Sequence, residues 1–185
     1  MKRQPLTELA HRRLAARLRP GDWVVDATAG NGHDTLFLAR TVSPGGRVFA
    51  FDVQCRALAA TRRRLQAADP DATVTLIRAG HQRMARHLPP AARGRLAAVM
   101  FNLGYLPGAD KSLVTRPDTT LAALTTAAEW LAPGGLLSIL AYRHHPGGAD
   151  ETAAVTRWLD DLADWRIERH ASPGPLWLLA QRPHE

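Results

Sequence analysis

The sequence contains one cysteine, two lysines and no long apolar run. A single cysteine, Cys55, excludes an intramolecular disulfide framework and a zinc site built on a cysteine cluster. A membrane-spanning helix needs about 20 consecutive apolar residues, and no segment of the chain reaches that length. The N-terminal segment MKRQPLTELAHRRLAARL also lacks the continuous apolar core of a signal peptide. These absences predict a soluble, cytoplasmic protein with neither a membrane span nor a metal site.

The composition is that of a folded protein. Of 185 residues, 45% are hydrophobic and 22% are charged, which excludes a fully disordered chain. The length fits one domain, so we expect residues 1–185 to form a single domain.

Arginine supplies most of the positive charge. Lys2 and Lys111 are the only lysines, so 22 of the 24 cations are arginine, and the formal net charge is +7. Residues 1–20 hold six cations and one acid, whereas the rest of the chain is nearly balanced. Leucines at helical spacing predict a helix at residues 6–18 whose basic face includes Arg12 and Arg13. We expect this face to bind a polyanion such as RNA; the alternative is a solvated amphipathic helix without a partner.

Predicted strands and helices alternate along the chain. Apolar runs and turn residues predict strands at 22–26, 47–52, 73–78, 96–101, 136–142, 165–170 and 176–181, and helices at 6–18, 34–40, 55–68, 119–131 and 149–162. This alternation predicts an α/β fold with a Rossmann-like, doubly wound, mostly parallel seven-stranded sheet. Only the turn 172–175 separates the last two strands, which is too short for a parallel crossover. They are therefore expected to form a C-terminal antiparallel hairpin.

The segment VVDATAGNGHDT, residues 24–35, has the composition of a ligand-binding loop between a strand and a helix. Gly30 and Gly32 let the backbone approach a ligand closely and adopt positive φ. The dinucleotide fingerprint needs a third glycine where this chain has Thr35, and Asp26 would repel a pyrophosphate. Asp52 ends the next strand, 22 residues after Gly30, where a carboxylate accepts from ribose hydroxyls.

A nucleoside with a cationic tail and no phosphates suits both aspartates, which favours S-adenosylmethionine over NAD. The expected cofactor-binding residues lie on the glycine loop and at the ends of the second, third and fourth strands: Asp26, Thr28, Gly30, Asn31, Gly32, Asp34, Thr35, Asp52, Val53, Gln54, His81 and Asn102. The alternative is that these glycines and aspartates only form tight turns and caps.

A second candidate loop, FNLGYLPGADKSLVT, follows the fourth strand. Its Asn102-Leu-Gly-Tyr105 resembles the N-P-P-Y loop of amino-group methyltransferases, in which amide and carbonyl oxygens hold the target nitrogen. Asp110 and Lys111 follow on the same segment. We expect Asn102, Tyr105 and Asp110 to be catalytic and Lys111 to contact the substrate; the alternative is an ordinary turn with a surface ion pair.

The fifth strand ends in AYRHHPGGADE. Because parallel strands end at one edge of the sheet, we expect Tyr142, His144 and His145 to project beside Asn102. Tyr142 and His144 are expected to be catalytic and His145 to contact the substrate; packing of the loop is the alternative. Two adjacent histidines without a third ligand make a poor metal site.

The motifs VDATAGNGHDTLFLA and FNLGYLPGADKSLVT, with the later Y-x-x-H-P-G-G, closely resemble a bacterial family described as putative rRNA methylases. The resemblance covers nearly the whole chain. Characterised members of that family are tRNA methyltransferases that methylate the 5-aminomethyl group of wobble 5-aminomethyl-2-thiouridine to give 5-methylaminomethyl-2-thiouridine. The chain departs from the usual patterns at Thr28, where many related loops have glycine, and at Arg143-His144.

The resemblance implies a class I methyltransferase fold, S-adenosylmethionine as cofactor and the anticodon region of tRNA as partner. It implies that the wobble base flips out of the RNA into the site. It also implies that Asn102 holds the aminomethyl nitrogen of this base, with Asp110 or His144 accepting the proton. The alternatives are an rRNA or small-molecule N-methyltransferase and a non-catalytic RNA-binding module of the same fold. The protein is expected to be a monomer or a homodimer.

Overall fold

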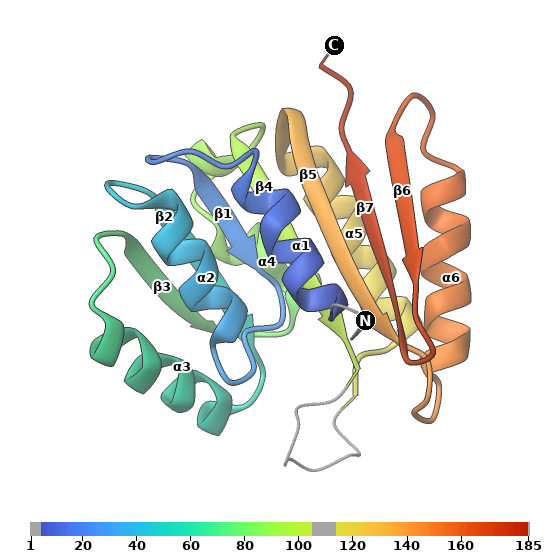
Figure 1. Ribbon diagram of the computed structural model, residues 1–185, viewed down its shortest axis with the longest axis horizontal. Helices are drawn as coiled ribbons and strands as arrows, with labels where there is room; N and C mark the ends of the chain where they lie inside the picture. The colour runs from blue at the N-terminus through green and yellow to red at the C-terminus, as the bar shows by residue number, and fades with distance from the viewer. Residues whose placement is uncertain (1–4, 105–113, 185) are drawn as a thin grey trace.

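A seven-stranded sheet forms the centre of the protein (Figure 1). The computed structural model describes residues 5–104 and 114–184. The strands are β1 (Trp23–Asp26), β2 (Arg47–Asp52), β3 (Thr73–Arg78), β4 (Leu96–Leu103), β5 (Leu131–Tyr142), β6 (Arg166–Ala171) and β7 (Pro175–Gln181). They lie in the order β3-β2-β1-β4-β5-β7-β6, with β1 to β5 parallel and β7 antiparallel to both neighbours. This topology confirms the predicted mostly parallel sheet with its C-terminal hairpin.

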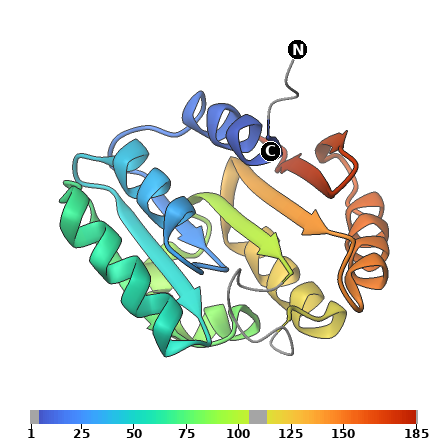
Figure 2. The ribbon, with the colours of Figure 1, turned by 60° about the horizontal axis from the view of Figure 1, so that its bottom comes forward.

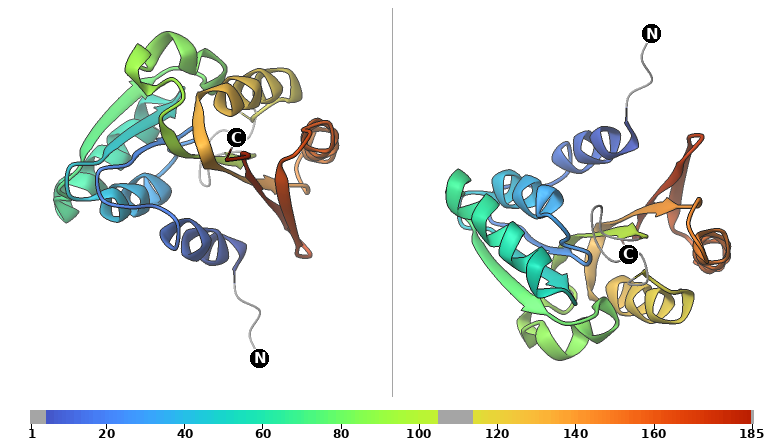
Figure 3. Two further views of the ribbon diagram at one scale, coloured as in Figure 1. Left: turned by 90° about the horizontal axis from the view of Figure 1, so that it is seen from above. Right: turned by 90° about the horizontal axis from the view of Figure 1, so that it is seen from below.

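Helices cover both faces of the sheet, as Figure 1 and Figure 3 show. One face carries α1 (Leu6–Ala15), α2 (His33–Val42) and α3 (Cys55–Ala68), and the other carries α4 (Met84–His87), α5 (Pro117–Trp130) and α6 (Gly148–Asp160). Two short 3-10 helices, η1 (His81–Arg83) and η2 (Pro90–Ala92), flank α4. Because the strands β1 to β5 are parallel, the loops that follow them lie along one edge of the sheet.

Alternate residues of the central strands enter two separate apolar cores. On β4, Ala98 and Met100 belong to the core beneath α1 and α2, whereas Val99 and Phe101 belong to the core beneath α5. The residues of β1 are buried at all four positions, as expected for a central strand of a sheet covered on both faces.

The N-terminal helix is part of the first of these cores. Leu14 on α1 is 0% exposed and lies in one cluster with Leu38, Val48 and Trp177. The indole N–H of Trp177 on β7 donates to the hydroxyl of Ser138 on β5 at 3.0 Å, so this core also joins the hairpin to the parallel strands. The helix is therefore an integral layer of the fold.

Three differences from the predicted elements exceed two residues. α1 ends at Ala15 rather than at residue 18, because the N–H groups of residues 17 and 18 both donate to the carbonyl of Leu14. β5 begins at Leu131 rather than at residue 136, because Leu131 already pairs with Leu96 and a bulge accommodates the Pro-Gly-Gly segment that follows. Residues 81–92 form η1, α4 and η2, which are too short for hydrophobic periodicity to indicate.

Replacement of Leu14 tests the packing of α1. We expect Leu14→Ala to lower the free energy of unfolding by about 2–5 kcal/mol, because it leaves a cavity in a fully buried cluster. Urea unfolding measures this change. Ala15→Ser, on the exposed side of the same helix, is the control and should change the free energy by less than about 0.5 kcal/mol. Equal, small effects of the two substitutions would contradict the burial of α1 against the sheet.

Candidate active site

The loop between β1 and α2, residues 27–32, lies at the edge of the sheet where the parallel strands end (Figure 2). Backbone hydrogen bonds join it to the strands on both sides. The N–H of Ala27 donates to the carbonyl of Met100 on β4, and the N–H of Ala29 donates to the carbonyl of Phe51 on β2, both at 2.8 Å. The predicted glycine loop therefore occupies the position at which ligands bind to open α/β sheets.

Glycine conformation and packing against α3 shape this loop. Gly30 and Gly32 adopt positive φ, of 52° and 79°. A Cβ on Gly32 would lie 2.7 Å from the Cα of Thr61, so a larger residue would displace backbone. The Thr61 hydroxyl donates to the carbonyl of Gly30 at 3.1 Å, and Nε of Arg64 donates to the carbonyl of Asn31 at 2.9 Å. Contacts within the protein therefore hold the backbone of this loop in place.

Asp52, at the end of β2, faces the glycine loop. One carboxylate oxygen accepts from the N–H of Gly30 at 2.9 Å, and the other accepts from the N–H of Gln54 at 2.8 Å. The side chain of Asp52 is partly exposed, and the next residue, Val53, is an apolar side chain that is 54% exposed. A fixed carboxylate followed by an exposed apolar side chain can hold the hydroxyls of a ribose and one face of its base.

Asp26, at the end of β1, is 0% exposed. Its oxygens accept from the N–H of Thr28 at 3.1 Å and from the hydroxyl of Thr35 at 2.6 Å. Burial, followed by the charge of Asp34, raises the pKa of Asp26 to about 7. The structure corrects the expectation that Asp26 meets a ligand directly, because its place on a covered central strand leaves the carboxylate no exposed surface. Asp26 instead fixes both ends of the loop.

Asp34, in the first turn of α2, links three parts of the chain. Its Oδ1 lies 2.6 Å from Nε2 of His11 on α1, and its Oδ2 accepts from Nδ2 of Asn102 on β4. The ring of His11 stacks on Phe37 of α2, with centroids 3.9 Å apart. The N–H of Asn102 donates to the hydroxyl of Thr28 at 2.7 Å. The glycine loop, α1 and the predicted catalytic asparagine therefore form one hydrogen-bonded assembly.

Tyr142 and His145 lie close to the end of β4. Tyr142 is 42% exposed, and the pKa of its phenol is raised by burial and by the charge of Asp34. A Cβ on Gly104 would lie 3.6 Å from both the Cβ of Tyr142 and the Nε2 of His145. The structure therefore brings together Asp34, Tyr142 and His145, three residues that the sequence assigned to one site.

His144 points elsewhere. Its Nε2 lies 2.6 Å from the carbonyl oxygen of Pro173 in the turn between β6 and β7. The guanidinium of Arg143 donates to the carbonyls of Ser172 and Gly174 in the same turn, at 2.5 Å and 3.1 Å. His144 therefore contacts the hairpin, and its catalytic role stays a prediction. These two side chains join the end of β5 to the hairpin, which no local sequence pattern indicates.

His81, after β3, supports the loop from the side of the α5 core. Its Nδ1 lies 3.3 Å from the carbonyl oxygen of Ala27, and its ring meets the edge of Phe101. Burial lowers the pKa of His81 to about 4, so the imidazole is neutral at pH 7. Contact between His81 and a bound base stays a prediction.

Three predicted site residues, Tyr105, Asp110 and Lys111, lie outside the described residues. The described residues on either side of them meet, because the N–H of Thr115 donates to the carbonyl of Gly104 at 3.0 Å.

The basic residues of α1 and of the segment that follows it are partly engaged with the hairpin. Nη2 of Arg13 lies 2.5 Å from Oε2 of Glu168 on β6, and Arg17 donates to Gln181 on β7 at 3.1 Å. Arg12 is exposed. Contact between RNA and Arg12 or Arg13 stays a prediction, but Arg13 would have to leave an ion pair to make it.

Sequence reasoning assigned no role to His11, Arg64 or Glu151. Glu151, buried in the first turn of α6, accepts from the hydroxyls of Thr115 and Thr120 at 2.7 Å and 2.6 Å and so joins α5 to α6. The sequence does hold an indication for His11, because this residue precedes Leu14 by three positions and therefore shares the buried face of α1. No local sequence pattern indicates the roles of Arg64 and Glu151, since their partners are 31 or more positions away.

Within residues 5–104 and 114–184, no three His, Cys, Asp or Glu side chains gather in a group that could hold a metal ion. No helix in this part of the chain combines the length and the apolar character that crossing a membrane requires.

The raised pKa of Asp26 predicts a pH dependence of stability. Between about pH 4 and pH 7 the folded protein binds a proton at Asp26 that the unfolded chain, with a pKa of 3.8, has lost. The free energy of unfolding therefore decreases as the pH rises through this range, by at most ~1.4 kcal/mol per pH unit. His81 makes the free energy of unfolding increase with pH between about pH 4 and 6.5, because its pKa is lower in the folded protein than in the unfolded chain.

Asp26→Asn separates the two contributions. The difference in free energy of unfolding, variant minus wild type, should increase from pH 4 to pH 7 and stay constant above pH 7, because His81 is common to both proteins. Urea unfolding at a series of pH values measures it. A difference that does not vary with pH would show that Asp26 is ionised in the folded protein throughout this range.

Known proteins resemble the chain in both sequence and structure. The model of the family described as Putative rRNA methylase matches residues 48–172. A curated relative from Arabidopsis thaliana, the chloroplastic tRNA (mnm(5)s(2)U34)-methyltransferase, is 41% identical over 173 residues, which are 88% of this chain. The matched region spans 62% of that relative's length.

Two solved structures share the fold over almost their whole length. A putative rRNA methylase from Clostridium thermocellum has a TM-score of 0.89 and 36% identity, and a putative methyltransferase from Streptococcus mutans in complex with SAH has a TM-score of 0.84 and 34% identity. Each comparison covers 98% of this chain and 99% of the other. The chain belongs to the Putative rRNA methylase family and has the fold of class I S-adenosylmethionine-dependent methyltransferases.

Proposed function

We propose that the protein is an S-adenosylmethionine-dependent tRNA methyltransferase that methylates the aminomethyl group of wobble 5-aminomethyl-2-thiouridine. The observation that carries this proposal is the hydrogen bond from Nδ2 of Asn102 to Asp34, beside the glycine loop. It fixes the asparagine amide at the edge of the sheet at which open α/β folds bind their ligands. The curated relative named for this tRNA modification supports the choice of substrate.

The residues at this edge fit the proposed cofactor. Positive φ at Gly30 and Gly32 opens the backbone toward a ligand, and the partly exposed carboxylate of Asp52 can accept from two ribose hydroxyls. Asp34 keeps a small exposed surface and supplies the negative charge that suits an α-amino group or a sulfonium. S-adenosylmethionine, when bound, supplies an electrophilic methyl group.

Asn102 can orient the target nitrogen. Because its Nδ2 donates to Asp34, the amide is fixed with its carbonyl oxygen as the remaining acceptor. An amine that donates to this oxygen is held with its lone pair directed away from the amide. Such positioning can supply much of the acceleration of a displacement reaction.

The amine must also lose its proton before it can react. A primary alkylammonium resembles lysine, so the free amine at pH 7 costs roughly 4–5 kcal/mol for a gap of ~3.4 pKa units. The half-buried ring of Tyr142 can reduce this cost by excluding water from the ammonium form. Asp110 and His144 stay the proposed proton acceptors; for His144 this would require the ring to leave the Pro173 carbonyl.

Nucleoside mass spectrometry tests the proposed function. The purified protein is incubated with S-adenosylmethionine and tRNA that carries 5-aminomethyl-2-thiouridine, and 5-methylaminomethyl-2-thiouridine should accumulate. tRNA without the aminomethyl group and rRNA are the controls and should remain unmethylated. Methylation of rRNA or of a free amine alone would favour the alternative methyltransferases, and tRNA binding without binding of S-adenosylmethionine would favour a non-catalytic RNA-binding module.

Asn102→Ala tests the role of the amide. We expect kcat to fall by about 100-fold or more, because the target nitrogen loses its acceptor, while the affinity for S-adenosylmethionine changes by less than about threefold. Single-turnover kinetics measures the first value and titration calorimetry the second. A loss of cofactor affinity that matches the loss of activity would place Asn102 in the cofactor site alone.

A further inference from the structure

A groove of about 500 Å³ crosses the outer surface of α2, between α1 and α3. α2 contributes His33, Phe37 and Arg40 to its lining, α1 contributes His11, and α3 contributes Arg64. Phe37 and His11 are stacked, so their joined rings form one wall. No residue that lines the groove carries a negative charge. The groove is therefore basic and has an aromatic wall.

The two arginines of the groove keep donors for a ligand. Arg40 is exposed, and its guanidinium has no hydrogen-bond or ion-pair partner among residues 5–104 and 114–184. Arg64 uses Nε on the carbonyl of Asn31 and one N–H of Nη2 on Nε2 of His33, at 2.9 Å and 3.0 Å. A guanidinium has five N–H donors, so three on Arg64 remain. Planar forks of this kind match the oxygens of a phosphate.

Two contacts connect the groove to the proposed active site. His11, on one wall, is also the partner of Asp34, and Arg64, on the opposite wall, holds Asn31 of the glycine loop. His33 and Arg40 are seven residues apart on α2, so the basic lining extends about 10 Å along the helix from the loop. An RNA strand that enters the site can therefore continue along the groove.

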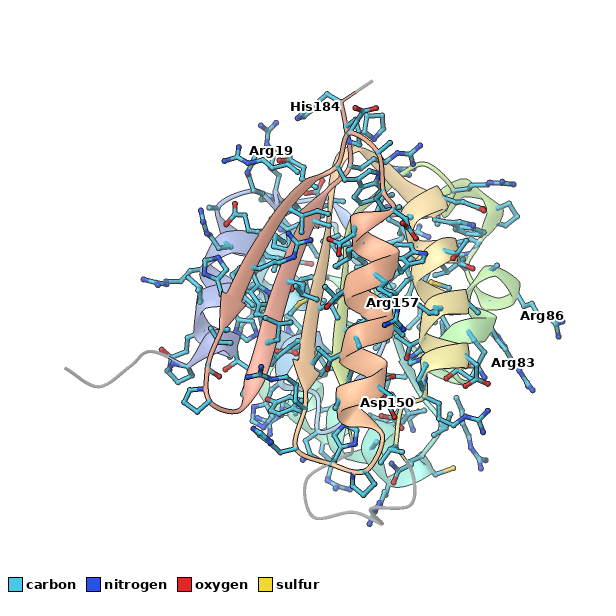
Figure 4. All side chains as sticks on the ribbon, turned by 90° about the vertical axis from the view of Figure 1, so that its right-hand side faces the viewer. Arg19, Arg83, Arg86, Asp150, Arg157 and His184 are labelled. Carbon is cyan, nitrogen blue, oxygen red and sulfur yellow. The ribbon has the colours of Figure 1, made fainter. Side chains whose placement is uncertain are left out.

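Several other arginines lie away from the groove or are paired with acids. Figure 4 shows Arg19, Arg86 and Arg157 at different places on the protein, with Arg86 on α4, Arg157 on α6 and Arg19 between α1 and β1. Arg116 and Arg169 are paired with Asp118 and Asp160. The groove differs from these positions because its guanidinium donors lie beside the active-site loop.

We propose that this groove binds the sugar–phosphate backbone of the RNA substrate, with Arg40 and Arg64 as phosphate ligands. The proposal rests on the proposed function and adds to it the surface that holds the RNA beside the reacting base. Phosphate is favoured over an acidic protein because the spare donors are guanidinium forks and the groove leads to the site proposed to receive a nucleotide.

Salt-dependent tRNA binding tests the proposal. Arg40→Gln is the main variant, since Arg40 contacts neither the glycine loop nor the predicted catalytic residues. Arg86→Gln is the matched control, because it removes one exposed arginine from α4, on the opposite face of the sheet. We expect Arg40→Gln to weaken binding of an unmodified tRNA transcript about fivefold to tenfold and to reduce the log–log salt slope by about 0.7–0.9, with an unchanged slope for Arg86→Gln.

The outcomes separate this proposal from the proposed function. Equal changes in tRNA affinity and salt slope for Arg40→Gln and Arg86→Gln would contradict RNA binding in the groove, because only net charge would then matter. So would Arg40-dependent binding of polyglutamate with unaffected tRNA binding, which would assign the groove to an acidic protein. If the wild-type protein methylates tRNA and Arg40→Gln does not change tRNA binding, only RNA binding in the groove is contradicted. If the wild-type protein neither binds nor methylates tRNA, the proposed function is contradicted.

Discussion

The carboxylate of Asp34 is the point on which the arrangement of the site depends. It accepts from Asn102 at the end of β4 and lies 2.6 Å from His11 on α1, while its own backbone lies in the first turn of α2. Two buried carboxylates, Asp34 and Asp26, therefore lie close together, and the protein tolerates them because the pKa of Asp26 is raised to about 7.

This constraint explains why the N-terminal helix is built into the fold. α1 covers the core around Leu14 and also brings His11 to Asp34, so its packing and the geometry of the site depend on each other. On the other side of α2, Thr61 and Arg64 of α3 hold the backbone of the glycine loop. The loop and the asparagine are thus positioned by three helices on one face of the sheet, and the hairpin of β6 and β7 is joined to that layer through Arg13.

Local patterns predicted the strands, the hairpin and the glycine loop, because apolar alternation, β-branched runs and turn residues act over a few positions. They also placed Asp52 at a strand end beside the loop. Local patterns did not indicate the surroundings of a residue when these come from distant parts of the chain. Burial of Asp26 follows from helices on both faces of the sheet, and the orientation of His144 follows from a turn 29 positions away. No spacing in the sequence encodes either contact.

The central claim, that Asp34 acts by orienting Asn102, is tested most directly by a double-mutant cycle on kcat at saturating S-adenosylmethionine and tRNA. The cycle combines Asp34→Asn with Asn102→Ala, and thermal unfolding checks that all three variants fold. If Asp34 orients the amide, Asp34→Asn should lower kcat severely in the wild-type background but only slightly once Asn102 is alanine, since nothing is left to orient. Equal losses in both backgrounds would show that Asp34 acts independently of Asn102 and would contradict the claim.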